Sequence, residues 1–356
     1  MSEFLTLHEI YRAARERTED GPWWYMMGGA ETETTLRRNR QAIDSVAFRP
    51  RVLRDVSRVE FATTILGQPS RLPVFLAPIG SLQSISPGGA LAAARGAEAF
   101  GVPSFLSSVT QPSLEEVAAG TRHPKVFQLY VRGDHAWVEA HVRRAIDSGY
   151  RGFCLTVDTA VYSRRERDLI GRYTPASRRT PEGHVYQAGM SWDLVKWYKD
   201  RFSLPLVLKG IATAEDARLA LDHGAAAIYV SNHGGRQLDH GAGSLEMLPE
   251  IVAAVAGRAE VYVDGGFSRG TDILKALALG ARAVGIGRLY GIGLAAAADA
   301  GVKRVLEILE DEISIGMALL GVTRLEELGP QCLRPATPLP PIPGTPSSAF
   351  PFLGQG

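Results

Sequence analysis

The stretch SNHGGRQLDH, residues 231–240, follows an apolar run and presents an imidazole, two glycines and a guanidinium in quick succession. A turn would need only the glycines. His233 is a candidate general base, because the unperturbed pKa of histidine lies near neutral pH. Arg236 and Arg165 can clamp a carboxylate with paired N–H donors, and Asp158 can orient and stabilise an imidazolium. Together these residues predict a site that deprotonates a group attached to an anion.

Lys209 ends another apolar run, LVLKG. A lysine in this context has to meet an anion, an electron-rich ring or a carbonyl substrate, because an unpaired buried charge is costly. Two chemical roles fit: the Schiff-base nucleophile of an aldolase, or a cation facing a flavin that becomes an anion on reduction. A structural ion pair is the third possibility, and the residue alone does not decide among them.

The elements that would position these residues are short apolar runs that alternate with helical patterns. Eight runs lie at 73–78, 102–108, 126–131, 152–158, 204–210, 226–232, 260–266 and 283–288, and helical patterns lie at 89–100, 113–119, 134–148, 191–202, 213–223, 244–256 and 269–279. Such alternation indicates a parallel sheet covered on both faces. Eight units predict an α/β fold of the closed (β/α)8 TIM-barrel type, whose active residues lie at the carboxyl ends of the strands. A doubly wound open sheet is disfavoured, because the first run ends in Ala-Pro-Ile-Gly and not in a GxGxxG turn.

Two glycine-rich turns, VDGGFSRGTD and GIGRLYG, follow the seventh and eighth runs. In a TIM barrel these two loops frequently bind phosphate through bare backbone N–H groups and a helix N-terminus. Arg288 can add a charge-assisted hydrogen bond. Tight turns that require positive φ are the structural alternative. The position of both turns favours a phosphate site.

Three segments lie outside the repeat, although a single barrel domain is expected over residues 1–334. Residues 1 to about 72 predict an N-terminal extension of helices with a short hairpin. An insertion at 159–190 carries six arginines against three acidic residues. It is either a solvated flap or a lid over the barrel mouth, since long ordered loops are usually functional. The proline-rich tail, 335–356, is expected to be extended or disordered.

The composition excludes several classes of protein. The 356 residues include 39 basic and 38 acidic side chains, a balance that gives no support for nucleic-acid binding. The N-terminal sequence predicts an amphipathic helix and not a signal peptide, and no segment approaches the ~18 apolar residues of a membrane span, so a cytoplasmic protein is expected. Two cysteines, Cys154 and Cys332, cannot form a zinc site alone, and no metal is expected. Cys154 lies in an apolar run, which predicts a buried, inert thiol.

Five motifs, SNHGGRQLD, LTVDT, FQLY, LVLKG and DGGFSRGTD, together resemble the FMN-dependent L-2-hydroxy acid oxidising enzymes. This family includes glycolate oxidase, lactate oxidase and monooxygenase, mandelate dehydrogenase and the flavocytochrome lactate dehydrogenases. The resemblance runs from about Tyr25 to about Leu328 and so covers nearly the whole chain. SNHGGRQLD after a strand is its most specific part.

The resemblance implies that an L-2-hydroxy acid is oxidised to the 2-keto acid, with FMN as cofactor. His233 would take the proton of the α-hydroxyl while the α-hydrogen leaves as hydride to flavin N5. A carbanion route, in which His233 removes the α-proton, uses the same residues. Asp158 would pair with the imidazolium that forms. The implied substrate-binding residues are Tyr25, Tyr130, Arg165, His233 and Arg236.

The resemblance also implies a set of cofactor contacts. Lys209 would face the N1–C2 carbonyl edge of the flavin and stabilise the reduced anion. Residues implied near the flavin ring or ribityl chain are Pro78, Ile79, Gly80, Ser107, Gln128, Thr156 and Ser231. Those implied at the ribityl and phosphate groups are Asp264, Gly265, Gly266, Gly287 and Arg288.

The sequence departs from the family pattern at several positions. Ser268 stands where many relatives carry a phosphate-binding arginine; Arg269 is expected to point elsewhere, which would leave more of the anion binding to Arg288. Val109 replaces the tryptophan of the glycolate oxidase pattern, and the insertion after the fourth strand is shorter. These changes favour a larger aryl or alkyl 2-hydroxy acid over glycolate. Gly80 follows the monooxygenase and mandelate dehydrogenase pattern, which favours slow peroxide release or an acceptor other than oxygen.

Three other functions compete with this interpretation. A Schiff-base lyase would use Lys209 but would leave His233 beside Arg236 unexplained. An FMN-dependent isomerase on a similar barrel would bind FMN without being reduced by a hydroxy acid. A non-catalytic flavoprotein is disfavoured, because the base and both arginines are present. The expected partners are a small 2-hydroxy acid and oxygen or an external electron acceptor, and the family implies a homo-oligomer, a tetramer or octamer.

Overall fold

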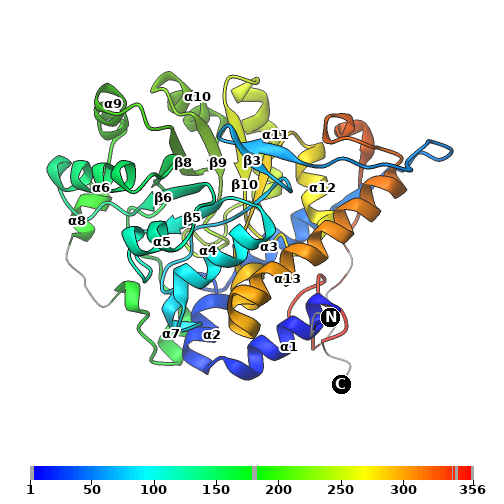
Figure 1. The fold of residues 1–356 in the computed structure, drawn as a ribbon, viewed down its shortest axis with the longest axis horizontal. Coiled ribbons are helices and arrows are strands. Elements are labelled where there is room, and N and C mark those ends of the chain that lie inside the picture. The colour runs from blue at the N-terminus through cyan, green and yellow to red at the C-terminus, as the bar shows by residue number, and fades with distance from the viewer. Residues whose placement is uncertain (1–3, 179–182, 339, 341–343, 354–356) are drawn as a thin grey trace.

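The computed structural model describes residues 4–178, 183–338, 340 and 344–353, and its centre is a closed barrel of parallel strands (Figure 1). The strands follow one another around the barrel in chain order, and the last pairs with the first. They are β4 (Val74–Leu76), β5 (Ser104–Ser107), β6 (Lys125–Leu129), β7 (Gly152–Thr156), β8 (Leu206–Ile211), β9 (Ala227–Val230), β10 (Glu260–Val263) and β11 (Ala283–Ile286). Each predicted run overlaps one of these strands, so the TIM barrel is confirmed.

Helices between and after the strands cover the outside of the barrel. They are α4 (Gly89–Phe100), α5 (Leu114–Gly120), α6 (His135–Asp147), α9 (Trp192–Arg201), α10 (Ala214–Asp222), α11 (Ser244–Val255), α12 (Gly270–Ala278) and α13 (Arg288–Leu320). Several begin at a side-chain cap; Ser113 and Asp134, for example, each accept a hydrogen bond from the first turn. No helix was predicted after the eighth run, where α13 spans 33 residues and is kinked at Ala297 and Ala298.

The N-terminal extension contacts both ends of the barrel: its hairpin closes the amino-terminal end, and α2 and α3 border the cavity at the carboxyl end. It contains α1 (Leu7–Arg17), α2 (Asp20–Met27), α3 (Thr34–Asp44), β1 (Val46–Phe48) and a hairpin of β2 (Thr63–Ile65) and β3 (Gln68–Ser70). At the hairpin turn, Ile65 packs inside the barrel against Phe75 and Phe105. The backbone N–H of Leu66 donates to the Tyr262 hydroxyl at 3.1 Å. This apolar plug fills the amino-terminal half of the barrel, so ligands have to bind at the opposite end.

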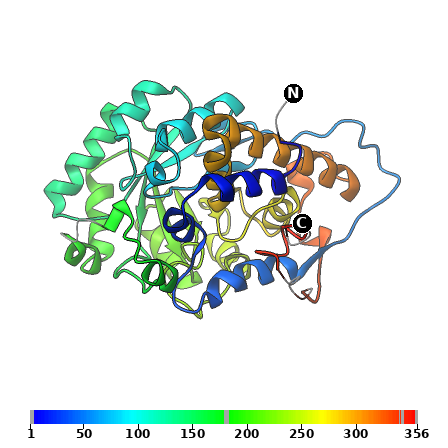
Figure 2. The same cartoon turned by 90° about the horizontal axis from the view of Figure 1, so that it is seen from below.

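The insertion and the tail contain short elements. The insertion forms α7 (Glu166–Ile170), α8 (His184–Ala188) and the 3-10 turn η2 (Ala176–Arg178), and 179–182 lie outside the described residues. Further 3-10 turns are η1 (Leu82–Ser84), η3 (Leu325–Glu327) and η4 (Pro330–Cys332). The tail begins as β12 (Leu333–Pro335), antiparallel to β1. Its described end, 344–353, packs beside α1 (Figures 1 and 2) and is not merely extended, because Ala349 and Phe350 are buried.

Two simpler expectations also bear on the fold. Cys154 is fully buried, and burial raises the pKa of its thiol, as expected for an inert core residue. Within the described ranges, no helix is long and apolar enough to cross a membrane.

Candidate active site

A cavity of about 610 Å³ opens at the carboxyl ends of the barrel strands. This volume is typical of a cofactor or ligand site. Most of the predicted site residues line it: Tyr25, Pro78, Ile79, Gly80, Tyr130, Arg165, Lys209, His233, Arg236, Asp264, Gly265, Gly266, Gly287 and Arg288. Asp158 and Ser231 contact lining residues directly, whereas Ser107, Gln128 and Thr156 are buried in the strands beneath.

His233 is held between two partners from different strand ends. Its Nδ1 lies 3.1 Å from Asp158 Oδ1, and its Nε2 lies 3.1 Å from the Tyr130 hydroxyl. An ionised carboxylate can only accept hydrogen bonds, so Nδ1 carries the proton and Nε2 keeps its lone pair. Tyr130 can then donate to Nε2. The geometry therefore gives His233 the tautomer that a general base needs.

The charges around His233 support the same protonation states. Burial raises the pKa of Asp158, but the facing His233 and Lys209 more than offset this, so its pKa lies below the ordinary value. Burial lowers the pKa of His233. The charge of Asp158 raises it again, but by less than burial lowers it, so the pKa stays below the ordinary value. A carboxylate beside a neutral imidazole is thus the stable pair near neutral pH.

The loop after β9 adopts an unusual backbone to present His233. His233, Gly234 and Gly235 all have positive φ, at 58°, 64° and 74°. A Cβ on Gly235 would lie 2.5 Å from the backbone nitrogen of Leu36 in α3. The glycines are needed because the loop turns in the left-handed region and packs against α3.

Arg165 and Arg236 form a cationic pair at the cavity, Arg165 from the insertion at 159–190 and Arg236 from the loop after β9. Arg165 is 5% exposed, and its Nη2 donates to the carbonyl oxygen of Arg236 at 3.3 Å. The Arg236 guanidinium stacks over the Tyr25 ring at 4.6 Å. Burial, together with the charge of Arg236, lowers the pKa of Arg165 to about 10. An anion bound between these guanidinium groups would relieve their repulsion, as expected for a carboxylate clamp.

Lys209 belongs to a buried polar network at the floor of the cavity. Its Nζ donates to Ser231 Oγ at 2.9 Å and lies 3.6 Å from Asp264 Oδ2. Ser231 Oγ in turn donates to Asp264 Oδ1 at 2.6 Å. Burial lowers the pKa of Lys209, but Asp264 and Asp158 more than compensate, so its pKa lies above the ordinary value. Lys209 therefore stays charged.

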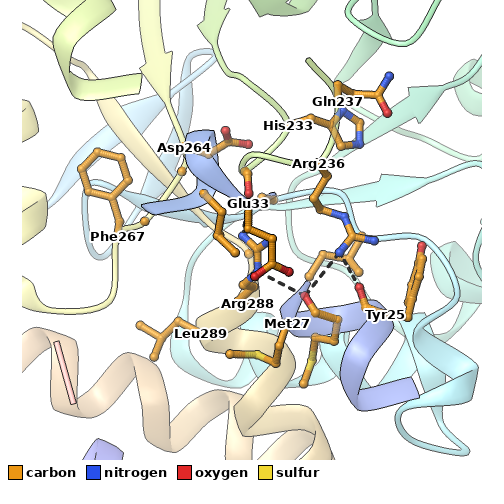
Figure 3. Close-up of a pocket in the computed structure, with 18 of the residues that line it drawn as sticks. Tyr25, Met27, Glu33, His233, Arg236, Gln237, Asp264, Phe267, Arg288 and Leu289 are labelled. Carbon is orange, nitrogen blue, oxygen red and sulfur yellow. Dashed lines mark hydrogen bonds between the residues drawn. The ribbon is translucent and has the colours of Figure 1, made fainter. Parts of the chain in front are cut away.

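Arg288 differs from its expected role as an anion-binding side chain. Its guanidinium donates to the carbonyl oxygens of Met26 at 3.1 Å, Gly234 at 3.0 Å and Gly28 at 2.8 Å. Figure 3 shows the side chains of Arg236 and Arg288 both directed toward the end of α2. In this structure the Arg288 side chain ties α2 to the loop after β9. The backbone N–H groups at the start of α13 have no side-chain cap and are available to an anion.

The two glycine turns differ in how their helices begin. The first turn of α12 is capped by Asp272, whose Oδ2 accepts from the backbone N–H groups of Ser268 at 2.9 Å and Arg269 at 3.0 Å. The first turn of α13, after Gly287, has no side-chain cap. Arg269 pairs with Glu312 on α13 and points away from the cavity, as expected. A phosphate is therefore best placed at the start of α13.

The buried groups fit a flavin. Gln128 is fully buried, and its Nε2 donates to Thr156 Oγ1 at 2.9 Å, which leaves Oε1 without a hydrogen-bond partner. A buried amide oxygen without a partner is costly, and a ring N–H of a bound flavin is a suitable donor. Lys209 supplies a cation for the reduced ring, and the glycine turns with the α13 N-terminus supply a phosphate site.

Sequence reasoning missed some of the lining. Tyr162 in the insertion lies under both Arg165, at 4.4 Å, and Arg178, at 3.0 Å, measured from guanidinium carbon to ring centre. Its position three residues before Arg165 was the only available signal. Glu33, in the loop between α2 and α3, also lines the cavity. Its carboxylate accepts a hydrogen bond from the backbone N–H of Gly29 at 2.9 Å and pairs with Arg167.

Residues 14–335 match the family described as FMN-dependent dehydrogenase. The chain belongs to this family. It is 41% identical over 350 residues to glycolate oxidase 5 of Oryza sativa subsp. japonica, covering 92% of this chain and 95% of the relative. It is also 41% identical over 355 residues to L-lactate oxidase of Nostoc sp., covering 92% and 97%. The crystal structure of mandelate oxidase with (S)-2-phenylpropionate matches with a TM-score of 0.87 and 38% identity, covering 95% of this chain and 100% of that one.

These matches confirm the resemblance and the cofactor. The family member described here is an FMN-dependent enzyme that oxidises L-2-hydroxy acids. The individual roles of its site residues and the identity of its substrate stay predictions.

Proposed function

We propose that this flavoenzyme uses His233 as its base and the Arg165–Arg236 pair as its carboxylate clamp, and that its substrate is larger than glycolate. One observation carries the assignment. His233 Nε2 faces the cavity with its tautomer set by Asp158, near the buried Arg165, the half-buried Arg236 and the charged Lys209 at the cavity floor.

The side chains divide the reaction among them. Arg165 and Arg236 bind the carboxylate of the hydroxy acid and orient its α-carbon. His233 Nε2 accepts the proton of the α-hydroxyl, and Asp158 stabilises the imidazolium that results. FMN, when bound, supplies the acceptor for the two electrons and the α-hydrogen. Tyr130, which lies 3.1 Å from Nε2, is positioned to bond the same substrate oxygen. Lys209 keeps a positive charge at the floor of the site throughout.

The lining supports a substrate with a bulky side chain. Val109 borders the cavity next to Gly80, where an indole would take up far more room. The rings of Tyr25 and Tyr162 also line the cavity, and the Tyr25 hydroxyl lies 3.5 Å from the position that a Cβ on Gly80 would take. The matching mandelate oxidase structure contains an aryl acid, (S)-2-phenylpropionate. An aryl or branched alkyl 2-hydroxy acid therefore fits this site better than glycolate.

The competing functions receive less support. A Schiff-base lyase needs a neutral amine, and such lysines have lowered pKa values. The pKa of Lys209 is raised by its anionic neighbours. An FMN-dependent isomerase would bind FMN without being reduced by a hydroxy acid, so the titration described below distinguishes it.

The electron acceptor and assembly are also proposed. Gly80 supports slow release of peroxide or reoxidation by an acceptor other than oxygen. The family resemblance supports a homo-oligomer, a tetramer or octamer, which light scattering would test.

The test is an anaerobic titration of the purified, FMN-loaded protein with glycolate, L-lactate, (S)-mandelate and longer alkyl 2-hydroxy acids, following the visible flavin band. Bleaching is expected with an aryl or branched acid at a rate above that with glycolate. Readmitting air afterwards separates rapid oxidase turnover from slow reoxidation. Fastest bleaching by glycolate would overturn the size assignment, and a flavin that no acid bleaches would overturn the reaction.

A further inference from the structure

The end of the C-terminal tail is packed against the N-terminal helix. Phe350 is 4% exposed and lies 5.2 Å from the Tyr11 ring and 5.7 Å from the His8 ring, both in α1. Arg12, one turn further along α1, donates to the carbonyl oxygen of Phe352 at 3.1 Å. The beginning of the tail is also anchored, because β12 pairs with β1. The segment is therefore held on both sides of its proline-rich stretch.

This segment, residues 344–353, also forms one wall of the cofactor cavity. Its lining residues are Thr345, Pro346, Ser347, Ser348 and Phe350. From α1 and α2, the rings of Tyr11 and Trp23 line the same end. In Figure 2 the tail, in red, lies beside α1, in dark blue. We name residues 344–353 the tail strap.

Hydrogen bonds connect the tail strap to the glycine turn after β10. Ser348 Oγ donates to Asp44 Oδ2 at 2.5 Å, and Asp44 Oδ1 accepts from Arg40 at 2.7 Å. Arg40 also donates to Asp272, the residue that caps the turn, and to the carbonyl oxygen of Gly266 at 3.4 Å. The wall made by the tail strap is thus next to the turn that borders the phosphate end of the site.

The residue at position 268 explains why the wall formed by the tail strap matters for holding FMN. The side chain there is serine, and Arg269 is committed to Glu312. The glycine turn after β10 therefore supplies no arginine side chain to the phosphate end of the cavity. Phe350 and the serines of the tail strap border the cavity at that point instead.

We propose that the tail strap closes the phosphate end of the FMN site and controls the passage of FMN in and out. This inference concerns how the cofactor is retained, and it does not depend on which hydroxy acid is oxidised. A strap that must lift for FMN to pass slows dissociation and association together. A segment that merely contacts bound FMN slows dissociation alone.

The experiment compares the full chain with a chain ending at Ala336 and with the single substitution Phe350→Ala. Free FMN fluoresces strongly and protein-bound FMN weakly, so mixing apoprotein with FMN gives the association rate. Displacement of bound FMN by a non-fluorescent flavin analogue gives the dissociation rate. Phe352→Ala is the matched control. This phenylalanine is 58% exposed and its ring lies 5.1 Å from the same His8 ring, but it does not line the cavity, so the control removes a contact with α1 without removing part of the cavity wall.

Both rates are expected to rise, at least tenfold in the truncated chain and several-fold in Phe350→Ala, with the control unchanged. An increase in the dissociation rate alone would contradict control of FMN passage and would show only that the tail strap contacts bound FMN. Unchanged rates in Phe350→Ala would also overturn it, even where the truncated chain fails to fold. No substrate is added, so failure here is distinct from failure of the proposed residue roles or substrate.

Discussion

The two ends of the cofactor cavity are built in different ways. At the proposed substrate end, side chains carry the chemistry. His233 and Asp158 stand on loops directly after barrel strands, whereas Tyr25 belongs to α2 and Arg165 to the insertion. At the phosphate end, backbone groups and remote segments do the work: the start of α13, the end of α3 and the tail strap. The difference indicates that substitutions at the first end alter reaction rates, whereas substitutions at the second alter how FMN is held.

The strongest test of this division is His233→Ala. Loss of a general base typically costs 10²–10⁴-fold, so anaerobic flavin reduction by the best hydroxy acid should slow by roughly that factor. FMN dissociation should not change, because the hydrogen bonds of His233 are to Asp158, Tyr130 and Ser231 and not to the tail strap. Stopped-flow absorbance measures the first quantity and flavin fluorescence the second.

His240→Ala is the matched control for this substitution. His240 lies in the same loop, is exposed and also has positive φ, at 60°. Replacing it imposes a similar backbone demand without removing the base. Near-normal reduction in His233→Ala, or an equal loss in His240→Ala, would remove His233 from the role of base.

A second test concerns room at the substrate end. A Cβ on Gly80 would lie 2.8 Å from Val109 Cγ2 and 3.5 Å from the Tyr25 hydroxyl, so Gly80→Ala forces a neighbour to move. A bulky 2-keto acid analogue has to compete for the space into which that neighbour moves. Overpacking typically costs about 1–3 kcal/mol, so binding of the analogue should weaken by up to roughly 150-fold. Titration of the flavin spectrum with the analogue measures this.

Adding Val109→Ala to Gly80→Ala should recover most of the lost affinity, because it removes the Val109 Cγ2 methyl group that the new Cβ at position 80 would contact. Val109→Ala alone serves as the control and should bind the analogue about as well as the unaltered enzyme. If the double variant binds no better than Gly80→Ala, contact with Val109 is not the cause of the lost affinity.

The contrast between the two ends also explains what the sequence could predict. The barrel and the strand-end residues follow from local patterns: an apolar run, then a polar residue at a position that the fold brings to one mouth. Contacts between distant segments carry no such pattern. Nothing near Arg288 indicates that its guanidinium would bond the end of α2, and the composition of the tail conceals the buried Phe350.

The smallest expected effect is the pH dependence of reduction, and it should appear only at the substrate end. Burial lowers the pKa of His233 below 6.5, with Asp158 opposing and Lys209 and Arg165 reinforcing the shift. The neutral base therefore already predominates at pH 7, and the reduction rate should rise by at most about a third between pH 7 and 9. Below the His233 pKa the rate should fall about tenfold per unit, because the imidazole becomes protonated.

Asp158→Asn identifies the group behind this acid limb. The substitution removes the charge that raises the pKa of His233, so the limb should move to lower pH while the maximal rate falls. His184, in the insertion, also lines the cavity, and burial with Arg132 and Arg178 lowers its pKa too. An acid limb that stays in place in Asp158→Asn and disappears in His184→Ala would assign the titration to His184. An acid limb that moves to lower pH in Asp158→Asn would assign the titration to His233. The pH dependence would then arise at the end of the cavity where side chains carry the chemistry.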